Sequence, residues 1–504
     1  MAKQVAIYSI LILVVLFAYS KMLEYGLKGS DFGYFHLLDE KFAGIFGGPI
    51  DDVPSYKNLT APYLGHAVLG RILEYLVATT FGYWIRAYRF LEVLILIILN
   101  LSFYKMLKYS TKSSWLSLLG ALFLTANAPG FEIYEQYSYF IERIPVIPIA
   151  LVGFIFWVKS FEKRNLINYV LATGIYISAM LLGHYAIMLL PLFVFFTLFK
   201  KPKFSHFIAR IAPILLVVVI IIQYSTAGPT TFESQGRRSL NTNPLQIFNN
   251  QEGIVRKVMV QLTSVLIPSE AIAIHERNSG KTFNEAFNEF IIPSMLAYAF
   301  LSLYILKICH PRLKVLYLTA QFSLLSTTLV NLYLDRVDFE AELGASRLYY
   351  IPHLFLSIVI PIIVYNLVKK RRLKSLKGLV IVFISMVLYL DIMSIHKTLN
   401  YYKTTYAGVI KTIDWASKES HVLPKWSIVY LPQALGTPPL FFFQQHFGNH
   451  LKFLSYDQLS EAIPDSNEDT NVYLLEFNEN YKLEKVEGLE IVVTGVSKSP
   501  KIQK

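Results

Sequence analysis

Long apolar runs, separated by short polar clusters, dominate the first 395 positions of the chain. A membrane-spanning helix needs about 20 mostly apolar residues, and eleven runs of roughly that kind occur. They lie near 5–22, 85–107, 114–129, 144–160, 167–183, 185–199, 207–224, 290–308, 315–334, 351–368 and 377–395. The pattern predicts an α-helical polytopic membrane protein with about eleven transmembrane helices.

The pattern changes after His396, where hydropathy falls and short alternating segments begin. A helical stretch is expected near 404–420, and strands near 427–431, 451–454 and 472–477, the last leading into a hairpin. We therefore predict two parts, a transmembrane domain over 1–395 and a small soluble α/β domain over 396–504.

Composition supports the membrane class, because 54% of the 504 residues are hydrophobic and only 16% are charged. The net charge of +12 does not point to nucleic acid, since Lys and Arg occur in short clusters between apolar runs. The single cysteine, Cys309, excludes an intrachain disulfide framework.

The basic clusters give an orientation, because loops on the cytoplasmic side carry the excess of Lys and Arg. With Lys3 inside, alternate loops carry five basic clusters, near 105–112, 159–164, 200–203, 307–314 and 369–374. The moderately apolar segment 61–81 contains His66, Arg71 and Glu74, so it is predicted to be an interfacial or re-entrant helix in the first outer loop. This topology places the N-terminus in the cytoplasm and the C-terminus outside the plasma (inner) membrane.

The first outer loop carries carboxylates soon after the first membrane helix: Asp31, Asp39 and Glu40. A carboxylate at this boundary can accept a proton from a hydroxyl of an acceptor, and a positioned general base contributes a factor of about 10² to 10⁴ in rate. The alternative is that Asp31 caps a loop helix and that Asp39 and Glu40 form a solvated face.

Cationic and polar side chains are expected at the same outer boundary. Arg89 lies at the outer end of the second span, His184 at a turn between two spans, and Arg347 and Tyr349 just before the tenth span. Arginine can hold a phosphate with two hydrogen bonds. The alternatives are snorkelling to lipid headgroups for Arg89, a simple turn for His184, and pairing with an acidic loop residue for Arg347.

Several segments, in this order and topology, resemble the GT-C membrane glycosyltransferases, in particular the protein mannosyltransferase and aminoarabinose transferase branch (glycosyltransferase families 39 and 83). The matching pieces are Asp31 to Tyr34, Ala61 to Leu64 leading to Phe81-Gly82 and Arg89, Leu182 to Ala186 running to Pro191, and Arg347 to Pro352. The resemblance covers roughly residues 1–395.

The resemblance implies a GT-C-like fold and an enzyme that moves a hexose or pentose, with inversion, from a polyprenyl-phosphate donor to a hydroxyl of a protein, glycan or glycolipid of the cell envelope. Asp31 would be the base, while Arg89, Arg347 and His184, with Tyr349, would bind the donor phosphate. Because the adjacent Asp-Glu pair of the family is Asp39-Glu40 here, Asp39 is an alternative base. No cofactor is predicted, and a requirement for a divalent cation is left open. The C-terminal domain would help to hold the acceptor.

Two other functions compete with this one. A lipid-linked polysaccharide polymerase or ligase would share the many helices and a large outer loop with paired arginines such as Arg237 and Arg238. A transporter would carry charged residues within its spans, and Glu92 and Asp391 are the main ones here.

Overall fold

The structure is a computed structural model in which most of the membrane part of the chain is described. The described residues are 2–25, 70, 73, 76, 77, 80, 81, 84–130, 132–135, 137–163, 165–200, 203–226, 251–334, 349–369, 377–419, 427–431, 451–455, 472–477 and 483–486.

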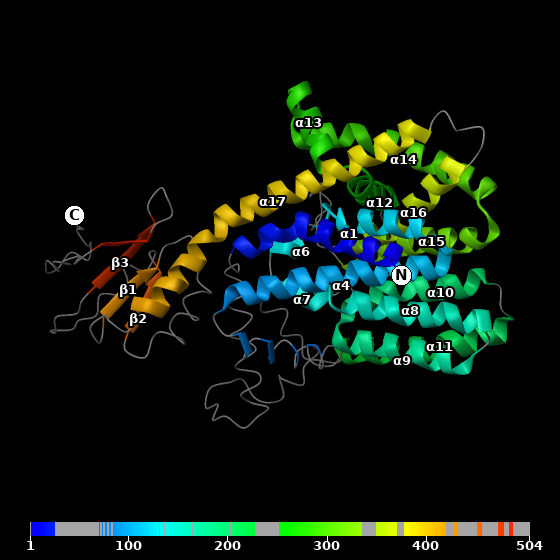
Figure 1. Ribbon diagram of the computed structural model, residues 1–504, viewed down its shortest axis with the longest axis horizontal. Coiled ribbons are helices and arrows are strands. Elements are labelled where there is room, and N and C mark those ends of the chain that lie inside the picture. The colour runs from blue at the N-terminus through cyan, green and yellow to red at the C-terminus, as the bar shows by residue number, and fades with distance from the viewer. Residues whose placement is uncertain are drawn as a thin grey trace.

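Helices make up nearly all of the described membrane part, and most of them lie side by side along the long axis in Figure 1. The first half contains α1 (Ala2–Tyr19), η1 (Ser20–Glu24), α4 (Ile85–Thr111), α5 (Ser114–Thr125), α6 (Glu132–Glu135), α7 (Tyr137–Arg143), α8 (Val146–Lys163), α9 (Leu166–Leu182), η3 (His184–Leu189), α10 (Leu190–Phe199) and α11 (Phe204–Thr226). The second half contains α12 (Gln251–Leu266), α13 (Ser269–Ser279), α14 (Phe283–Ile308), α15 (Pro311–Leu334), α16 (Tyr350–Lys369) and α17 (Lys377–Glu419).

Each of the eleven predicted apolar runs contains a helix, so the prediction of a helical polytopic membrane protein is confirmed. Within the described residues, seven helices are long and apolar enough to cross a membrane: α1, α4, α11, α14, α15, α16 and α17. The apolar helices α5, α9 and α10 are shorter, and α8 ends in a charged turn that contains Lys159, Glu162 and Lys163.

The region between the predicted runs near 207–224 and 290–308 contains two helices that the apolar pattern does not reveal. Helices α12 and α13 meet at a bend of 94° next to Pro268. Polar residues such as Gln261 and Thr263 interrupt the apolar pattern of α12, yet both side chains are buried. These polar side chains lower the hydropathy of the segment, so its sequence does not resemble that of a membrane-spanning helix.

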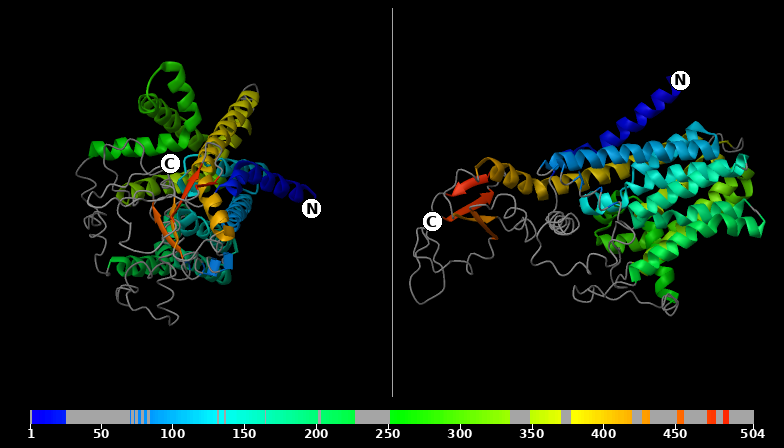
Figure 2. Two further views of the ribbon diagram at one scale, coloured as in Figure 1. Left: turned by 90° about the vertical axis from the view of Figure 1, so that its left-hand side faces the viewer. Right: turned by 90° about the horizontal axis from the view of Figure 1, so that it is seen from below.

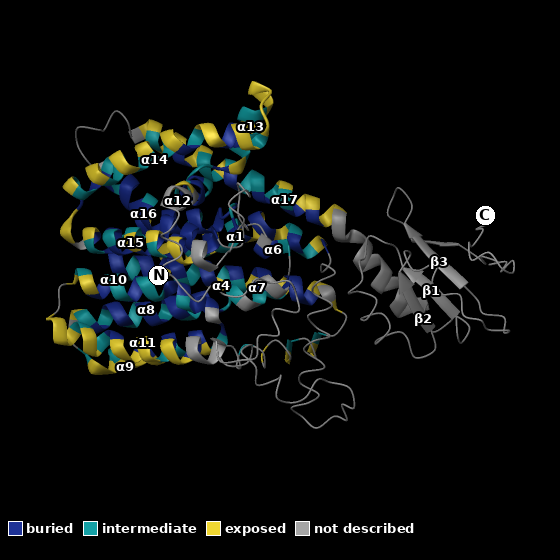
Figure 3. Ribbon diagram, turned by 180° about the vertical axis from the view of Figure 1, so that it is seen from behind, coloured by how far each residue is buried: buried dark blue, intermediate teal, exposed yellow. Residues whose placement is uncertain are grey.

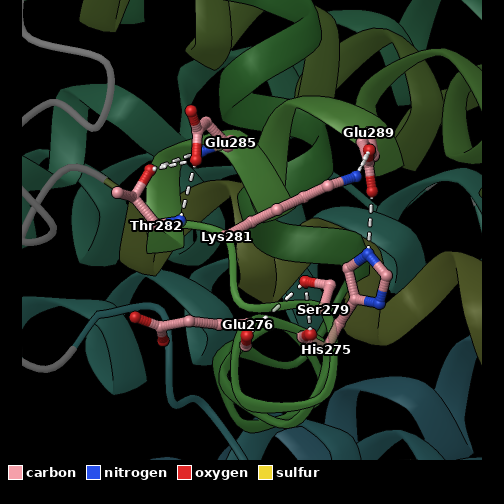
Figure 4. Close-up of polar contacts among 7 residues, drawn as sticks. All are labelled: His275, Glu276, Ser279, Lys281, Thr282, Glu285 and Glu289. Atoms are coloured by element: carbon pink, nitrogen blue, oxygen red, sulfur yellow. Dashed lines mark hydrogen bonds and ion pairs between the residues drawn. The ribbon is translucent and has the colours of Figure 1, made fainter.

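The junction of α13 and α14 shows how local polar contacts fix a helix start (Figure 4). The Thr282 side chain accepts a hydrogen bond from the Glu285 backbone, and the Glu285 carboxylate accepts one from the Thr282 backbone at 2.9 Å. This reciprocal capping box begins α14. On the next turn, Glu289 contacts His275 of α13 at 2.8 Å and also Lys281, which ties the two helices together.

Burial separates a central group of helices from a peripheral one (Figure 3). Helix α16 is the most enclosed of the candidate spans, with 78% of its apolar window buried, whereas only 11% of that of α14 and 17% of that of α17 is buried. Apolar side chains that face outward on a membrane protein contact lipid, so the peripheral helices present the lipid-facing surface.

Helix α17 leaves the bundle and leads to a small sheet at one end of the molecule (Figures 1 and 2). The sheet contains β1 (Ser427–Leu431), β2 (Leu451–Ser455), β3 (Val472–Phe477) and β4 (Leu483–Val486) in the order β2-β1-β3-β4. Strand β1 pairs in parallel with β2 and β3, and β3 with β4 forms the predicted hairpin. The three predicted strands are present, and α17 runs unbroken through the predicted boundary at 396. The division into two domains stays a prediction.

Candidate functional site

A short helix that ends inside the bundle organises the candidate site. Helix α5 has 12 residues, or about 18 Å at 1.5 Å per residue, so it does not cross a hydrocarbon layer of about 30 Å. The last carbonyl groups of a helix have no partner within it, and no water is available in a membrane interior. Other helices must therefore supply hydrogen-bond donors at the end of α5.

Two side chains from distant parts of the sequence meet this need. The Tyr19 hydroxyl of α1 donates to the Thr125 carbonyl at 2.7 Å, and Nε2 of His353 on α16 lies 2.8 Å from the Phe123 carbonyl. One turn earlier, the Asn100 amide of α4 donates to the Ala121 carbonyl at 3.0 Å. The end of α5 thus joins α1, α4 and α16 through buried polar groups.

A cluster of tyrosines extends this layer and connects the end of α1 to the start of α16. The hydroxyls of Tyr19 and Tyr134 are 2.9 Å apart, and the Tyr350 ring meets the Tyr134 ring edge-on at 6.4 Å. The Tyr25 hydroxyl donates to the Tyr134 carbonyl at 2.5 Å. Burial raises the pKa of Tyr134 well above its ordinary value, so this phenol stays neutral near pH 7.

The layer is close-packed around a glycine in the connection that follows α5. A Cβ added at Gly130 would lie 2.9 Å from Cδ2 of the Tyr350 ring and 3.3 Å from the Asn127 side chain. Only a residue without a side chain allows this approach. Gly130 therefore lets the tyrosine ring of α16 sit against the loop.

Arg89, one of the predicted phosphate-binding residues, lies fully buried at the edge of this layer. Its guanidinium donates to the Glu92 carboxylate at 2.8 and 3.1 Å and to the carbonyls of Tyr134 and Glu135 at 3.3 and 3.1 Å. It also lies 4.4 Å from the centre of the Tyr25 ring, which is a favourable cation–π arrangement. Both charges of the Arg89–Glu92 pair are removed from solvent.

Of the other predicted site residues, two lie within the described part of the chain and four lie outside it. Tyr349 is buried just before α16, next to Tyr350 of the tyrosine cluster. His184 begins η3. Asp31, Asp39, Glu40 and Arg347 lie outside the described residues. Of the predicted residues, the structure therefore brings Arg89 and Tyr349 to the polar layer.

Sequence reasoning missed the tyrosines and amides that build the layer. Asn100 and His353 are polar residues inside apolar runs, a signal that could have identified them. Tyr19, Tyr134 and Tyr350 gave no such signal, because tyrosines near the ends of spans are common at the membrane interface. Among the described residues, no group of three or more His, Cys, Asp or Glu side chains could hold a metal ion.

Comparison with known proteins finds similarity at the level of structure. No protein-family model and no curated protein matches the chain. The chain is similar to a solved structure described as the crystal structure of ArnT from Cupriavidus metallidurans bound to undecaprenyl phosphate. The similarity covers 94% of this chain and 93% of that chain, with 11% sequence identity and a TM-score of 0.46, values too low to carry an argument about function.

Proposed function

We propose that this chain is a GT-C-like integral membrane glycosyltransferase that moves one sugar from a polyprenyl-phosphate donor to an acceptor hydroxyl on the outer face of the membrane, with inversion. The observation that carries the proposal is the polar layer at the end of α5. It joins the end of α1, from which the first loop departs, to the start of α16, where the loop with Arg347 arrives.

Chain length sets an upper limit on the distance of two predicted residues from this layer. An extended chain spans at most about 3.6 Å per residue. Asp31 follows Tyr25 by six residues and Arg347 precedes Tyr349 by two, which limits their Cα distances from those tyrosines to about 22 Å and about 7 Å. Asp39 and Glu40 follow Tyr25 by 14 and 15 residues, so chain length limits their distances less tightly, and Asp39 stays the alternative base.

The proposed chemistry is a single displacement at the anomeric carbon. Asp31 accepts the proton of the acceptor hydroxyl. The hydroxyl oxygen bonds to the anomeric carbon while the bond from that carbon to the phosphate oxygen breaks. The leaving polyprenyl phosphate keeps the electron pair, and the Arg347 guanidinium stabilises its growing negative charge. His184 and Tyr349 are proposed to contact the donor.

Arg89 receives a different role from its geometry. Its charge is balanced by Glu92, and its donors are directed at Glu92 and at two carbonyls. We therefore propose that Arg89 fixes the position of Tyr25, where the first loop leaves the bundle. Of the two arginines for which the family resemblance implies a phosphate contact, we propose that Arg347 makes it.

Helix α17 gives the C-terminal sheet a fixed relation to the same region. It runs parallel to α1, with His396 Nε2 2.8 Å from the Phe17 carbonyl and Lys21 Nζ 2.7 Å from Asn400 Oδ1. We propose that this packing holds the sheet near the first loop, where it helps to bind the acceptor, a protein, glycan or glycolipid.

The test is sugar transfer by the purified full chain in lipid nanodiscs. Labelled polyprenyl-phosphate sugars are offered with peptide, glycan and glycolipid acceptors, and release of sugar to water serves as an acceptor-independent signal. Asp31→Asn should lower the rate by about 10² to 10⁴, while Asp51→Asn, a matched carboxylate change in the same loop, should leave it unchanged. Asp39→Asn and Glu40→Gln run in parallel, and a chelator arm tests the need for a divalent cation.

Two outcomes would contradict the proposal. If the folded wild-type protein uses none of the donors, the transferase function is wrong. If activity survives Asp31→Asn and Asp39→Asn but is lost in Arg237→Ala and Arg238→Ala, with chain growth on a lipid-linked glycan, the protein is a polymerase or ligase.

A further inference from the structure

The side-chain amide of Asn100 has hydrogen-bond partners for its nitrogen but not for its oxygen among the described residues. The residue is 3% exposed in the middle of α4. Its Nδ2 donates to the Ala121 carbonyl and also contacts Oγ1 of Thr125. Its Oδ1 has no hydrogen-bond partner among the described residues. A buried carbonyl oxygen in this state calls for a donor.

A small cavity lies beside Asn100 between α1, α4, α5 and α16. Its volume of about 10 Å³ is close to the lower limit for holding one water molecule. Asn100, Thr125, Tyr19 and Tyr350 form its polar wall, and Val15 with three leucines forms the rest. The cavity is therefore half polar and half apolar.

The hydrogen-bond donors on the polar wall are already used. Tyr19 donates to the Thr125 carbonyl, so the contact between Tyr19 and Tyr134 is donated by Tyr134. The Thr125 hydroxyl donates to the Ala121 carbonyl at 3.0 Å, and Tyr350 is hydrogen-bonded to Tyr134. What the wall still offers is an acceptor, Asn100 Oδ1.

We propose that one buried water molecule occupies this cavity and donates a hydrogen bond to Asn100 Oδ1. An empty cavity is disfavoured, because an unsatisfied buried carbonyl costs more than the immobilisation of a water that satisfies it. A dehydrated Na⁺ ion is disfavoured as well, because half of the wall is apolar and cannot replace its hydration shell. The water would lie between the four helices that line the cavity and would satisfy Asn100 of α4.

The first test is direct observation of the water in the full chain in nanodiscs, at a resolution at which ordered waters are visible. Density is expected about 2.5 to 3.0 Å from Asn100 Oδ1 in the wild type, the range for an O–H···O hydrogen bond, and it should be absent in Asn100→Leu. No density there, in a map that shows other buried waters, would overturn the proposal.

A second test uses a pair of near-isosteric substitutions and does not depend on resolution. Val15→Thr places a hydroxyl on the cavity wall, where a water can bond to it, so its unfolding midpoint should stay close to that of the wild type. Val359→Thr places the same hydroxyl at a fully buried position of α16 in the core cluster, and its midpoint should fall by several degrees. Equal losses in both variants would contradict the water.

An ionic-strength-matched comparison of NaCl with choline chloride separates water from a cation. The wild-type unfolding midpoint should be the same in both salts. A midpoint that rises with Na⁺ in the wild type and not in Asn100→Leu would show that the occupant is the ion. None of these measurements uses sugar transfer, so the result stands whether or not the protein proves to be a glycosyltransferase.

Discussion

The carboxylate of Glu92 holds the guanidinium of Arg89 through two hydrogen bonds of 2.8 and 3.1 Å, one turn apart on α4, with neither side chain reaching solvent. On the rival transporter function, the position of Glu92 within a span would mark a transport path. Its geometry is that of a fixed partner, since Arg89 in turn bonds to two carbonyls of α6. A buried charge pair of this kind is a positioning element for the loops around it.

Glu92→Gln should destabilise the fold strongly, because it leaves the Arg89 charge buried without its partner. Loss of one partner of a buried pair costs about 3 to 5 kcal/mol. The double variant Arg89→Met with Glu92→Leu should recover most of that loss, since both charges are removed. The unfolding free energies of the single and double variants, compared in a double-mutant cycle, test this recovery. A double variant as unstable as Glu92→Gln would argue against it.

Gly120→Ala should destabilise the packing of α5 on α16. A Cβ at this position would lie 2.9 Å from the Ser357 carbonyl oxygen, a backbone atom that cannot move aside easily, and 2.3 Å from Cδ1 of Leu107. Overpacking of this kind costs about 1 to 3 kcal/mol. The matched control is Gly174→Ala in α9, where no atom lies within 4 Å of the new Cβ, and its unfolding midpoint should be equal to or slightly above that of the wild type.

The parallel packing of α1 and α17 predicts a specific crosslink. In a Cys309→Ala background, Lys21→Cys with Asn400→Cys should react with a short bismaleimide, because the native side chains meet at 2.7 Å. The control pair replaces Asn400 by Tyr389, which lies about 16 Å earlier along the helix and should not crosslink. Mass spectrometry of the digested protein identifies the linked peptides, and equal yields from both pairs would refute this register.

The thiol of Cys309 should react slowly in the folded protein. Burial raises its pKa above the ordinary value, and the thiolate is the reactive form. Because the folded state holds this proton more tightly, its contribution to stability is present below the unfolded pKa of about 8.5 and is lost as the pH rises through the folded value. Alkylation at pH 8 should accelerate on unfolding, and Cys309→Ala should flatten the alkaline fall in stability.

The sequence alone determined the helical membrane class and the positions of most elements. Apolar segments are stable away from water wherever they fold, so their length and spacing predict eleven of the helices, without knowledge of their packing, although the apolar pattern does not reveal α6, α7, α12 and α13. The alternation of short segments after His396 likewise locates three of the four strands of the C-terminal sheet, because period-two patterning is a local property of a strand.

The tertiary structure decided which polar groups meet. Tyr19, Asn100, Thr125 and His353 come from four helices, and only their packing places them around the end of α5. The sequence could show neither that Arg89 turns inward to Glu92 nor that Gln261 and Thr263 of α12 are buried. Such pairings depend on distances between segments far apart in the chain, which hydropathy and local propensity do not encode.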